Sequence, residues 1–282
     1  MLRLRRDMMV FPEGKEKAFT LSYDDGIKQD ERFIKLLKSR NLACTFNLNT
    51  GLMGDNDHLN QPGIDCTHYK FKKEEILSIY DGYEIAVHSH THPDLITVGE
   101  PMVAYELITN RKELEDLVHH PVRGMAYPMG THNQMVEDVA KSCGIAYART
   151  VNATHDFSIP SNFLTWDPTC HHTDERLMSL TDEFLTEATE SSKLFYVWGH
   201  TYEFDAFDGW SRMEQFLDRI AGHEDVWYAT NIEIFDYVNA YRNLIYSATG
   251  DYIENQSCLD VWIKIDGVTR VIKSGACISC EP

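Results

Sequence analysis

Positive charge is scarce in this chain. Of its 282 residues, 26 are lysine or arginine and 44 are aspartate or glutamate, which gives a formal net charge of −18. Binding to a phosphate backbone requires a positive surface, so this balance argues against a nucleic-acid-binding protein. The same balance argues, more weakly, against binding to anionic membranes or acidic polymers. A neutral or cationic substrate fits the charge better.

Long apolar runs and a regular cysteine pattern are also missing. No window approaches the roughly 20 apolar residues of a membrane-spanning helix. The basic start, MLRLRRDMMVFPEG, lacks the apolar centre of a signal peptide. The seven cysteines are odd in number and scattered, unlike a disulfide framework. Together these absences predict a soluble protein in the cytoplasm.

What the chain does contain is an alternation of strand-like and helix-like segments. Apolar residues recur with a period of two in the former and at helical spacing in the latter. Strands are expected near 18–25, 43–49, 83–89, 123–130, 144–150, 162–168, 193–200 and 225–231, and helices near 30–41, 101–118, 132–143, 174–189, 210–221 and 231–245. Such alternation predicts a parallel sheet covered by helices, either open or closed into a barrel.

Three stretches depart from this alternation. Residues 51–70 and 201–209 are expected as loops, and a long loop beside the sheet edge is a candidate substrate wall. After residue 245, apolar residues alternate on both sides of Asp266-Gly267, a dipeptide suited to a two-residue type I′ turn. We therefore expect a barrel domain over residues 1–245 and a β-hairpin-containing appendage over residues 246–282.

Polar residues gather at the carboxyl ends of the expected strands, where a barrel places its active site. They include the adjacent Asp24 and Asp25, His88 and His200. Imidazole nitrogens and one carboxylate oxygen make a three-ligand metal site that leaves a position for water. A neighbouring carboxylate can take a proton from water, and an opposing histidine can protonate a leaving group. These parts suit the hydrolysis of an acyl group.

The stretch IAVHSHTHPDL raises the question of which histidines would be ligands. His88 and His92 are four residues apart, a spacing that suits a helical turn after the strand ends. An extended strand would instead pair His88 with His90. The chain has thirteen histidines, so a chance clustering is a further alternative. The residues alone favour the first pair over the second.

Four motifs occur in order along the chain: SYDDG at 22–26, HSHTH at 88–92, YPMG at 127–130 and VWGH at 197–200. In order and spacing they resemble the motifs of the polysaccharide deacetylases of carbohydrate esterase family four, which share the chitooligosaccharide deacetylase homology domain. The resemblance covers roughly residues 15–240. It implies an α/β fold, an irregular (β/α) barrel of about seven strands, and removal of N- or O-acetyl groups from a sugar or polysaccharide.

The resemblance also implies a role for each motif residue. Asp24 becomes the general base and His200 the general acid, while Asp25, His88 and His92 bind a divalent metal ion. Zinc is expected ahead of cobalt, nickel or manganese, all of which such a ligand set accepts. The implied partner is an acetylated carbohydrate substrate.

Two residues of the family pattern are missing from their places. The arginine before the proline of the third motif is replaced by Ala126, and Arg123 lies three residues too early. The aspartate of the fourth motif is matched only within TWDPTCHH, where Asp167 is the candidate partner of His200. Because the metal, base and acid residues remain, these losses favour altered efficiency over inactivity.

Further residues are candidates for supporting the site or contacting substrate. Glu203 follows His200 by three positions and could orient its ring. Trp210 is the best candidate for stacking on a sugar, although core packing is the simpler expectation for every aromatic residue here. The remaining candidates are Tyr127, Pro128, His171 and His172.

Two alternative functions stay open. One is a related metal-dependent amidohydrolase that acts on a small non-sugar amide or ureide. The other is a non-catalytic sugar-binding protein on the same barrel, which the missing arginine favours slightly. Retention of Asp24, Asp25 and His200 argues against the second alternative, because a binding protein does not need a proton-transfer set.

Overall fold

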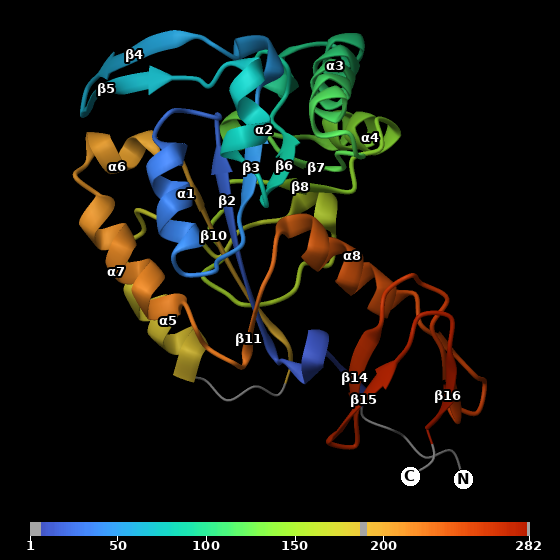
Figure 1. Ribbon diagram of the computed structural model, residues 1–282. Helices are drawn as coiled ribbons and strands as arrows, with labels where there is room; N and C mark the ends of the chain where they lie inside the picture. Colours follow the sequence, from blue (N-terminus) through green and yellow to red (C-terminus); the bar gives the residue numbers. More distant parts are fainter. Residues whose placement is uncertain (1–6, 187–190, 281–282) are drawn as a thin grey trace.

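One curled parallel sheet forms the centre of the molecule in the computed structural model, which describes residues 7–186 and 191–280 (Figure 1). Its strands are β2 (Lys17–Asp24), β3 (Thr45–Leu48), β6 (Glu84–Val87), β7 (Gly124–Ala126), β8 (Tyr147–Arg149), β9 (Cys170–His171), β10 (Lys193–Gly199) and β11 (Val226–Tyr228). They run in the order β8-β7-β6-β3-β2-β10-β9, and β11 pairs with the amino-terminal half of β2. The expected α/β class and barrel-like parallel sheet are confirmed.

Helices cover the outside of this sheet. They are α1 (Asp30–Lys38), α2 (Ile76–Ile79), α3 (Glu100–Val118), α4 (Gln134–Ser142), α5 (Leu177–Thr186), α6 (Tyr202–Ala206), α7 (Trp210–Ile220) and α8 (Asn231–Arg242). The expected helix at 174–189 begins later, at Leu177, and residues 187–189 lie outside the described part of the chain. Within that described part, no helix is long and apolar enough to span a membrane.

The central strand β2 determines which face of the sheet is polar. All eight of its residues are buried, as expected for a strand covered on both sides. Phe19, Leu21 and Tyr23 pack into the main apolar core under the helices. The alternate residues point into the barrel, where Thr20 donates a hydrogen bond to Asn231 at 2.8 Å. Because successive side chains of a strand point to opposite faces, Asp24 lies on the polar, interior face at the carboxyl end of β2.

The two stretches expected as loops have regular structure. Residues 51–70 contain a hairpin of β4 (Asn56–Gln61) and β5 (Ile64–Tyr69), joined by Pro62 and Gly63. Gly63 has φ = +86°, the left-handed conformation that the second central residue of a type II turn requires. Residues 201–209 contain the short helix α6. The loop expectation was wrong for both stretches, because their polar composition hid the strand pairing of the first and the helical turn of the second.

The strand expected at 162–168 was also wrong. Phe163–Thr165 form a 3₁₀ turn, and only an isolated bridge between Trp166 and Arg149 links this segment to β8. The Asn162 side chain accepts a hydrogen bond from Leu164 N at 3.0 Å, which favours a helical turn over an extended strand.

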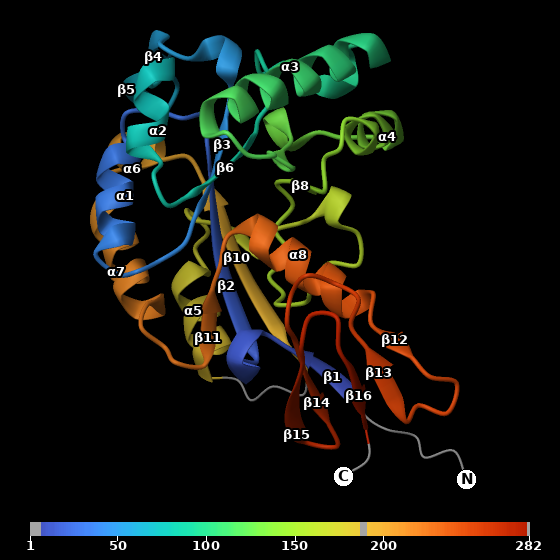
Figure 2. The ribbon, with the colours of Figure 1, turned by 45° about the vertical axis from the view of Figure 1, so that its right-hand side comes forward.

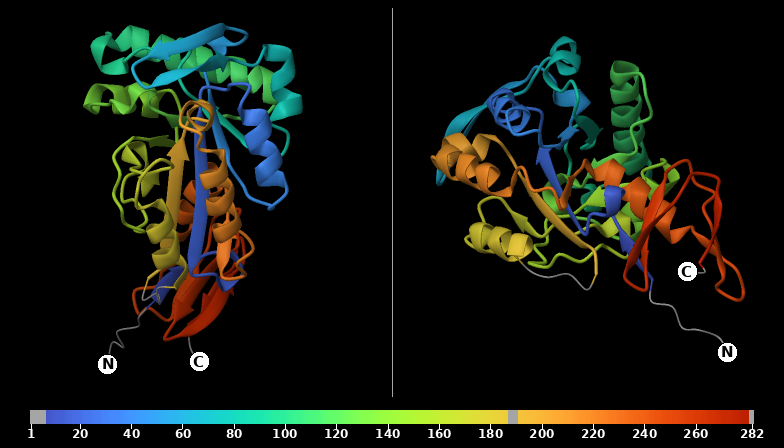
Figure 3. Two further views of the ribbon diagram at one scale, coloured as in Figure 1. Left: turned by 90° about the vertical axis from the view of Figure 1, so that its left-hand side faces the viewer. Right: turned by 60° about the horizontal axis from the view of Figure 1, so that its bottom comes forward.

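A separate antiparallel β structure lies at the amino-terminal end of the barrel strands (Figures 2 and 3). β14 (Val261–Ile265) and β15 (Val268–Ile272) form the expected hairpin, with positive φ at both Asp266 and Gly267 as a type I′ turn requires. β12 (Ile245–Tyr246), β13 (Tyr252–Glu254) and β16 (Cys277–Ser279) form a second small sheet. The first strand, β1 (Asp7–Val10), pairs with β14, so this structure is built from both ends of the chain.

A buried carboxyl group ties the start of α1 to the loop that carries His200. The Asp30 side chain is fully buried and accepts hydrogen bonds from the hydroxyls of Tyr80 and Thr201, both at 2.6 Å. Burial raises the pKa of Asp30 to about 7. Since an unfolded aspartate titrates near 3.9, the folded state binds the proton more tightly.

Stability is therefore expected to fall as the pH rises from about 4 to about 7, and the contribution of Asp30 to stay constant above pH 7. Asp30→Asn, which is neutral at every pH, should remove this part of the pH dependence, worth up to about 4 kcal/mol. Urea unfolding of wild type and Asp30→Asn at pH 5 and pH 8 measures this pH dependence of the unfolding free energy. Equal changes in unfolding free energy between the two pH values for both proteins would refute the prediction.

Candidate active site

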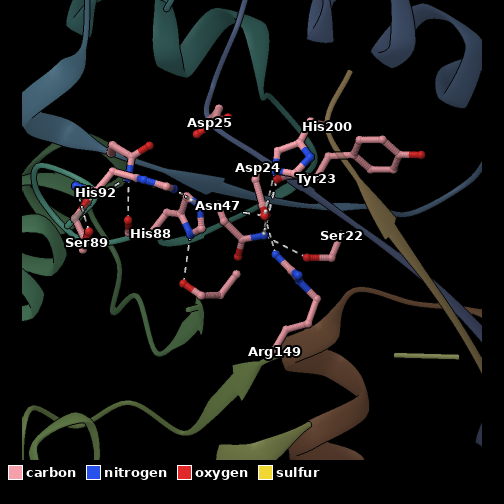
Figure 4. Close-up of polar contacts among 12 residues, drawn as sticks. Ser22, Tyr23, Asp24, Asp25, Asn47, His88, Ser89, His92, Arg149 and His200 are labelled. Carbon is pink, nitrogen blue, oxygen red and sulfur yellow. Dashed lines mark hydrogen bonds and ion pairs between the residues drawn. The ribbon is translucent and has the colours of Figure 1, made fainter. Parts of the chain in front are cut away.

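Asp24 lies at the centre of a group of charged side chains at the carboxyl end of β2 (Figure 4). Its side chain is nearly fully buried, and one oxygen pairs with the guanidinium of Arg149 while the other accepts a hydrogen bond from Asn47 at 2.8 Å. Burial alone would raise the pKa of Asp24, but Arg149, with His88 and His200, holds it below the ordinary value. The Asp24 carboxyl group is therefore ionised, and its two partners fix its orientation.

Arg149 is completely buried and comes from the end of β8. Its guanidinium lies over the ring of Trp198 with 4.3 Å between the guanidinium carbon and the ring centre. Arg123, by contrast, forms a partly exposed ion pair with Asp236 on α8. The Asp24 carboxylate thus has an arginine partner, which comes from β8 and not from the strand that carries the third motif.

Asp25 turns away from Asp24 because the chain adopts positive φ at this point. Its φ is +83°, an unfavourable conformation for a residue with a side chain, of the kind that clusters at functional sites. Lys70 Nζ lies 3.3 Å from Asp25 Oδ1, and His68 Nε2 lies 3.1 Å from Oδ2. Burial would raise the pKa of Asp25, but Lys70 and His68 hold it well below its usual range.

His88 and His92 are brought together by a tight turn. Ser89 and His92 both have positive φ, near +60°, and Ser89 Oγ accepts a hydrogen bond from His92 N at 3.0 Å. The two Nε2 atoms are 3.2 Å apart. The four-residue spacing predicts a helical turn here, whereas the segment is an irregular turn. His90 points elsewhere, toward Thr50 Oγ1 at 3.0 Å.

The three side chains Asp25, His88 and His92 fit a divalent metal ion. Their ligand atoms all lie within 4.8 Å of one another. His88 Nδ1 lies 2.9 Å from the carbonyl oxygen of Ala126, so an Nδ1–H donated there leaves Nε2 free as a ligand. Burial lowers the pKa of His88 to about 4 and lowers that of His92, so both rings are neutral, as metal ligands must be.

His200 faces Asp24 from the end of β10. Its Nε2 lies 3.8 Å from Asp24 Oδ2, and its Nδ1 lies 3.4 Å from Glu203 Oε2. Burial would lower the pKa of His200, but Glu203 and the two aspartates raise it to about 9. The ring is therefore protonated at neutral pH and can give up a proton.

Glu203→Gln is expected to lower the turnover rate of any reaction at this site that uses the His200 proton, by about 10- to 100-fold. The substitution removes the negative charge that stabilises the protonated His200 ring. The alkaline limb of the pH–rate profile should also move to lower pH. Glu113→Gln is the matched control, since Glu113 lies beside the Nδ1 atom of His90, 3.4 Å away, outside the site. An unchanged alkaline limb in Glu203→Gln would show that Glu203 does not raise the pKa of His200.

These side chains open into a pocket of about 800 Å³. Volumes of roughly 300–1,000 Å³ are typical of small-molecule sites. Aromatic side chains lie among the lining residues, which suits the C–H faces of a sugar ring. The aromatic lining residues are Tyr127, Trp198 and Tyr202, and the β4–β5 hairpin contributes Asp57, Leu59, Gln61 and His68.

The structure places the remaining candidates in different surroundings. Asp167 accepts hydrogen bonds from Thr150 and Asn152 and is not among the contacts of His200, so its expected role as partner of that histidine was wrong. Trp210 is buried in the core and donates to Asp205 at 2.7 Å, so it does not line the pocket for sugar stacking. Its apolar neighbours on α6 account for this burial.

Other candidates lie closer to the site. Tyr127 lines the pocket and donates its hydroxyl hydrogen to Leu164 O at 2.9 Å. Pro128 is buried beside it in a 3₁₀ turn. His171 and His172 lie next to Glu203, with Nε2 to Oε2 distances of 3.1 and 3.3 Å.

Arg149, Lys70 and His68 contact the two aspartates and were missed by sequence reasoning. Arg149 is the penultimate residue of the segment GIAYART, and the rule that polar residues at strand ends mark a barrel site would have found it. Lys70 is the last residue of the segment 51–70, which was expected as a loop, so no strand end marked it. An isolated antiparallel bridge between Ile27 and Lys70, which no periodicity indicated, brings Lys70 to Asp25.

Comparison with known proteins agrees with this fold. The Polysaccharide deacetylase family profile matches residues 12–148. A Mycobacterium smegmatis protein described as a polysaccharide deacetylase superposes with a TM-score of 0.61 and 16% identity, covering 83% of this chain and 94% of that chain. The Xyl-CE4 domain of a multidomain xylanase from the hindgut metagenome of Trinervitermes trinervoides superposes with a TM-score of 0.51 and 17% identity. The superposition covers 82% of this chain and 96% of that chain.

A third similar structure is that of the Streptococcus pyogenes deacetylase PplD in complex with acetate. It has a TM-score of 0.45 and 18% identity, with 52% of this chain and 61% of that chain covered. The chain thus spans less than two thirds of that relative. No curated protein matches the sequence. The resemblance to the polysaccharide deacetylases is confirmed: residues 12–148 carry the family's sequence pattern, and the barrel carries the fold of its solved relatives.

Proposed function

We propose that this chain is a divalent-metal-dependent hydrolase that removes acetyl groups from a sugar or polysaccharide. The observation that carries the proposal is the position of Asp24. Its ionised carboxylate is 3.8 Å from both His88 Nε2 and His200 Nε2, so it lies between a metal-ligand group and a protonated histidine. A base, an acid and a metal site converge on one pocket, an arrangement that can hydrolyse an amide or an ester.

The chain's own residues divide the reaction between them. Asp24 accepts a proton from the attacking water, and Arg149 and Asn47 hold both of its oxygens in place while it does so. As the bond from the acetyl carbon to the sugar nitrogen or oxygen breaks, His200 Nε2 donates a proton to the departing atom. A divalent ion held by Asp25, His88 and His92 would supply a Lewis acid that polarises the acetyl carbonyl and lowers the pKa of water.

Substrate class is tested with a panel of acetylated compounds and zinc-loaded protein. Release of acetate from N-acetylated chito-oligosaccharides or acetylxylan is expected, and hydrolysis of cyclic amides and ureides is not. Preference for the cyclic amides would replace the proposal with the small-amide alternative. Binding of chito-oligosaccharide without acetate release would indicate the sugar-binding alternative.

A further inference from the structure

We propose that His171, His172 and Glu203 form a second divalent-cation site, separate from the site of Asp25, His88 and His92. The three side chains come from the end of β9, the residue after it, and α6. Their ligand atoms all lie within 4.8 Å of one another. Two imidazoles and one carboxylate, with a position left for water, are a donor set that zinc accepts.

The distances in this cluster match those between ligands of one ion. Zinc bonds of about 2.0–2.1 Å in tetrahedral geometry place neighbouring ligand atoms about 3.3–3.4 Å apart. Glu203 Oε2 lies 3.1 Å from His171 Nε2 and 3.3 Å from His172 Nε2. The His88 and His92 Nε2 atoms of the first site have a similar separation, 3.2 Å.

The second observation is an unpartnered nitrogen. His172 is 4% exposed, and its Nε2 is buried without a hydrogen-bond partner although it points toward Glu203. A buried polar atom without a partner costs about 1–3 kcal/mol, so its position needs a reason. Coordination of a cation by this lone pair would satisfy it.

The fold holds His172 in this position. A Cβ atom on Gly199 would lie 1.9 Å from His172 Nδ1, so only glycine at the end of β10 leaves room for the ring. His172 Nδ1 lies 3.2 Å from the Tyr23 hydroxyl, and His171 Nδ1 lies 2.7 Å from Thr173 Oγ1. The Tyr23 oxygen can accept an Nδ1–H from His172, which leaves the Nε2 lone pair of His172 directed at the proposed ion. His171 Nδ1 accepts a hydrogen bond from Thr173 N at 3.3 Å, so binding through His171 Nε2 would move the ring proton to Nδ1, where Thr173 Oγ1 can accept it.

Two of the three proposed ligands line a pocket outside the active-site pocket. A second pocket of about 390 Å³ has His172 and Glu203 among its lining residues, with Thr173, Phe207 and Arg212. The active-site pocket instead contains His200 and the residues of the first site. The second cluster therefore borders a pocket other than the one that contains the first site.

Zinc content per chain tests the proposal. Metal-stripped protein is titrated with Zn²⁺ by isothermal titration calorimetry, and the bound metal is counted by mass spectrometry after gel filtration. Wild type is expected to bind two ions, and His171→Asn and His88→Asn one ion each. His120→Asn is the matched control, because His120 is exposed and lies outside both clusters, and it should bind two.

Each result separates this proposal from the proposed function. One ion in wild type that is lost in His88→Asn and kept in His171→Asn would overturn the second site and leave the active site intact. Two ions in His171→Asn would also overturn it. One ion in wild type that is lost only in His171→Asn would support the second cluster and contradict the first.

A second readout links the site to the proposed acid, and this link rests on the proposed function. Glu203 Oε2 also lies 3.4 Å from His200 Nδ1, so an ion on Glu203 competes with that histidine. Zinc beyond the first equivalent should slow acetate release by wild type and have a smaller effect on His171→Asn. Equal slowing of the two proteins would contradict the link.

Discussion

Asp24→Asn should lower the rate of acetate release about 10²- to 10⁴-fold while the protein still binds metal through Asp25, His88 and His92. The amide is nearly the same shape as the carboxylate but cannot accept a proton from water. It also faces two donors, Arg149 and Asn47, one of which loses its acceptor. Steady-state acetate assays and zinc content measure the two halves of the prediction.

The adjacent aspartate provides the control for this change. Asp25→Asn should lose affinity for zinc at the first site, because Asp25 belongs to the ligand cluster and Asp24 does not. Circular dichroism and thermal melting establish that both variants fold. Normal turnover by Asp24→Asn would show that another group is the base, and loss of zinc from Asp24→Asn alone would reverse the two roles.

Arg149→Met should have the next largest effect, on both stability and activity. It leaves the buried Asp24 carboxylate without its charged partner, and breaking a buried ion pair in this way costs about 3–5 kcal/mol. The pKa of Asp24 should rise, because burial then acts with less opposing charge. The acid limb of the pH–rate profile is expected to move to higher pH, which loss of packing alone would not cause.

Two further variants make the Arg149 result specific. Arg149→Lys keeps the charge but loses the planar group that stacks on Trp198, so an intermediate effect is expected. Arg123→Met removes an arginine from the same region whose partner, Asp236, is partly exposed, and should change turnover little. Equal losses in Arg123→Met and Arg149→Met would contradict the assignment.

The sequence predicted β2 and the turn at Asp266-Gly267 correctly, because a local pattern determines each of them. Alternation along β2 predicted a strand that ends at Asp24 with polar residues on one face, and the structure has that strand. Positive φ at Asp266 and Gly267 confirms the hairpin turn that the dipeptide predicted. Both depend on residues that are neighbours in the chain.

Contacts between distant segments were not predictable in the same way. Arg149 meets Asp24 across 125 positions, and no local pattern indicates which arginine will pair with a buried carboxylate. Trp210 follows polar residues in sequence, yet α6 and Arg32 cover its ring. Asp167 lies near β9 in sequence, but Thr150 and Asn152 hold its side chain.

The most direct test of the whole account compares one protein sample before and after metal is restored. Protein stripped by a chelator is assayed for acetate release from an N-acetylated chito-oligosaccharide, then reloaded with zinc or cobalt and assayed again. The account predicts no release by the stripped protein, recovery on reloading, and no recovery in Asp24→Asn. Full release by stripped protein, or no release by protein shown to hold metal at Asp25, His88 and His92, would contradict it.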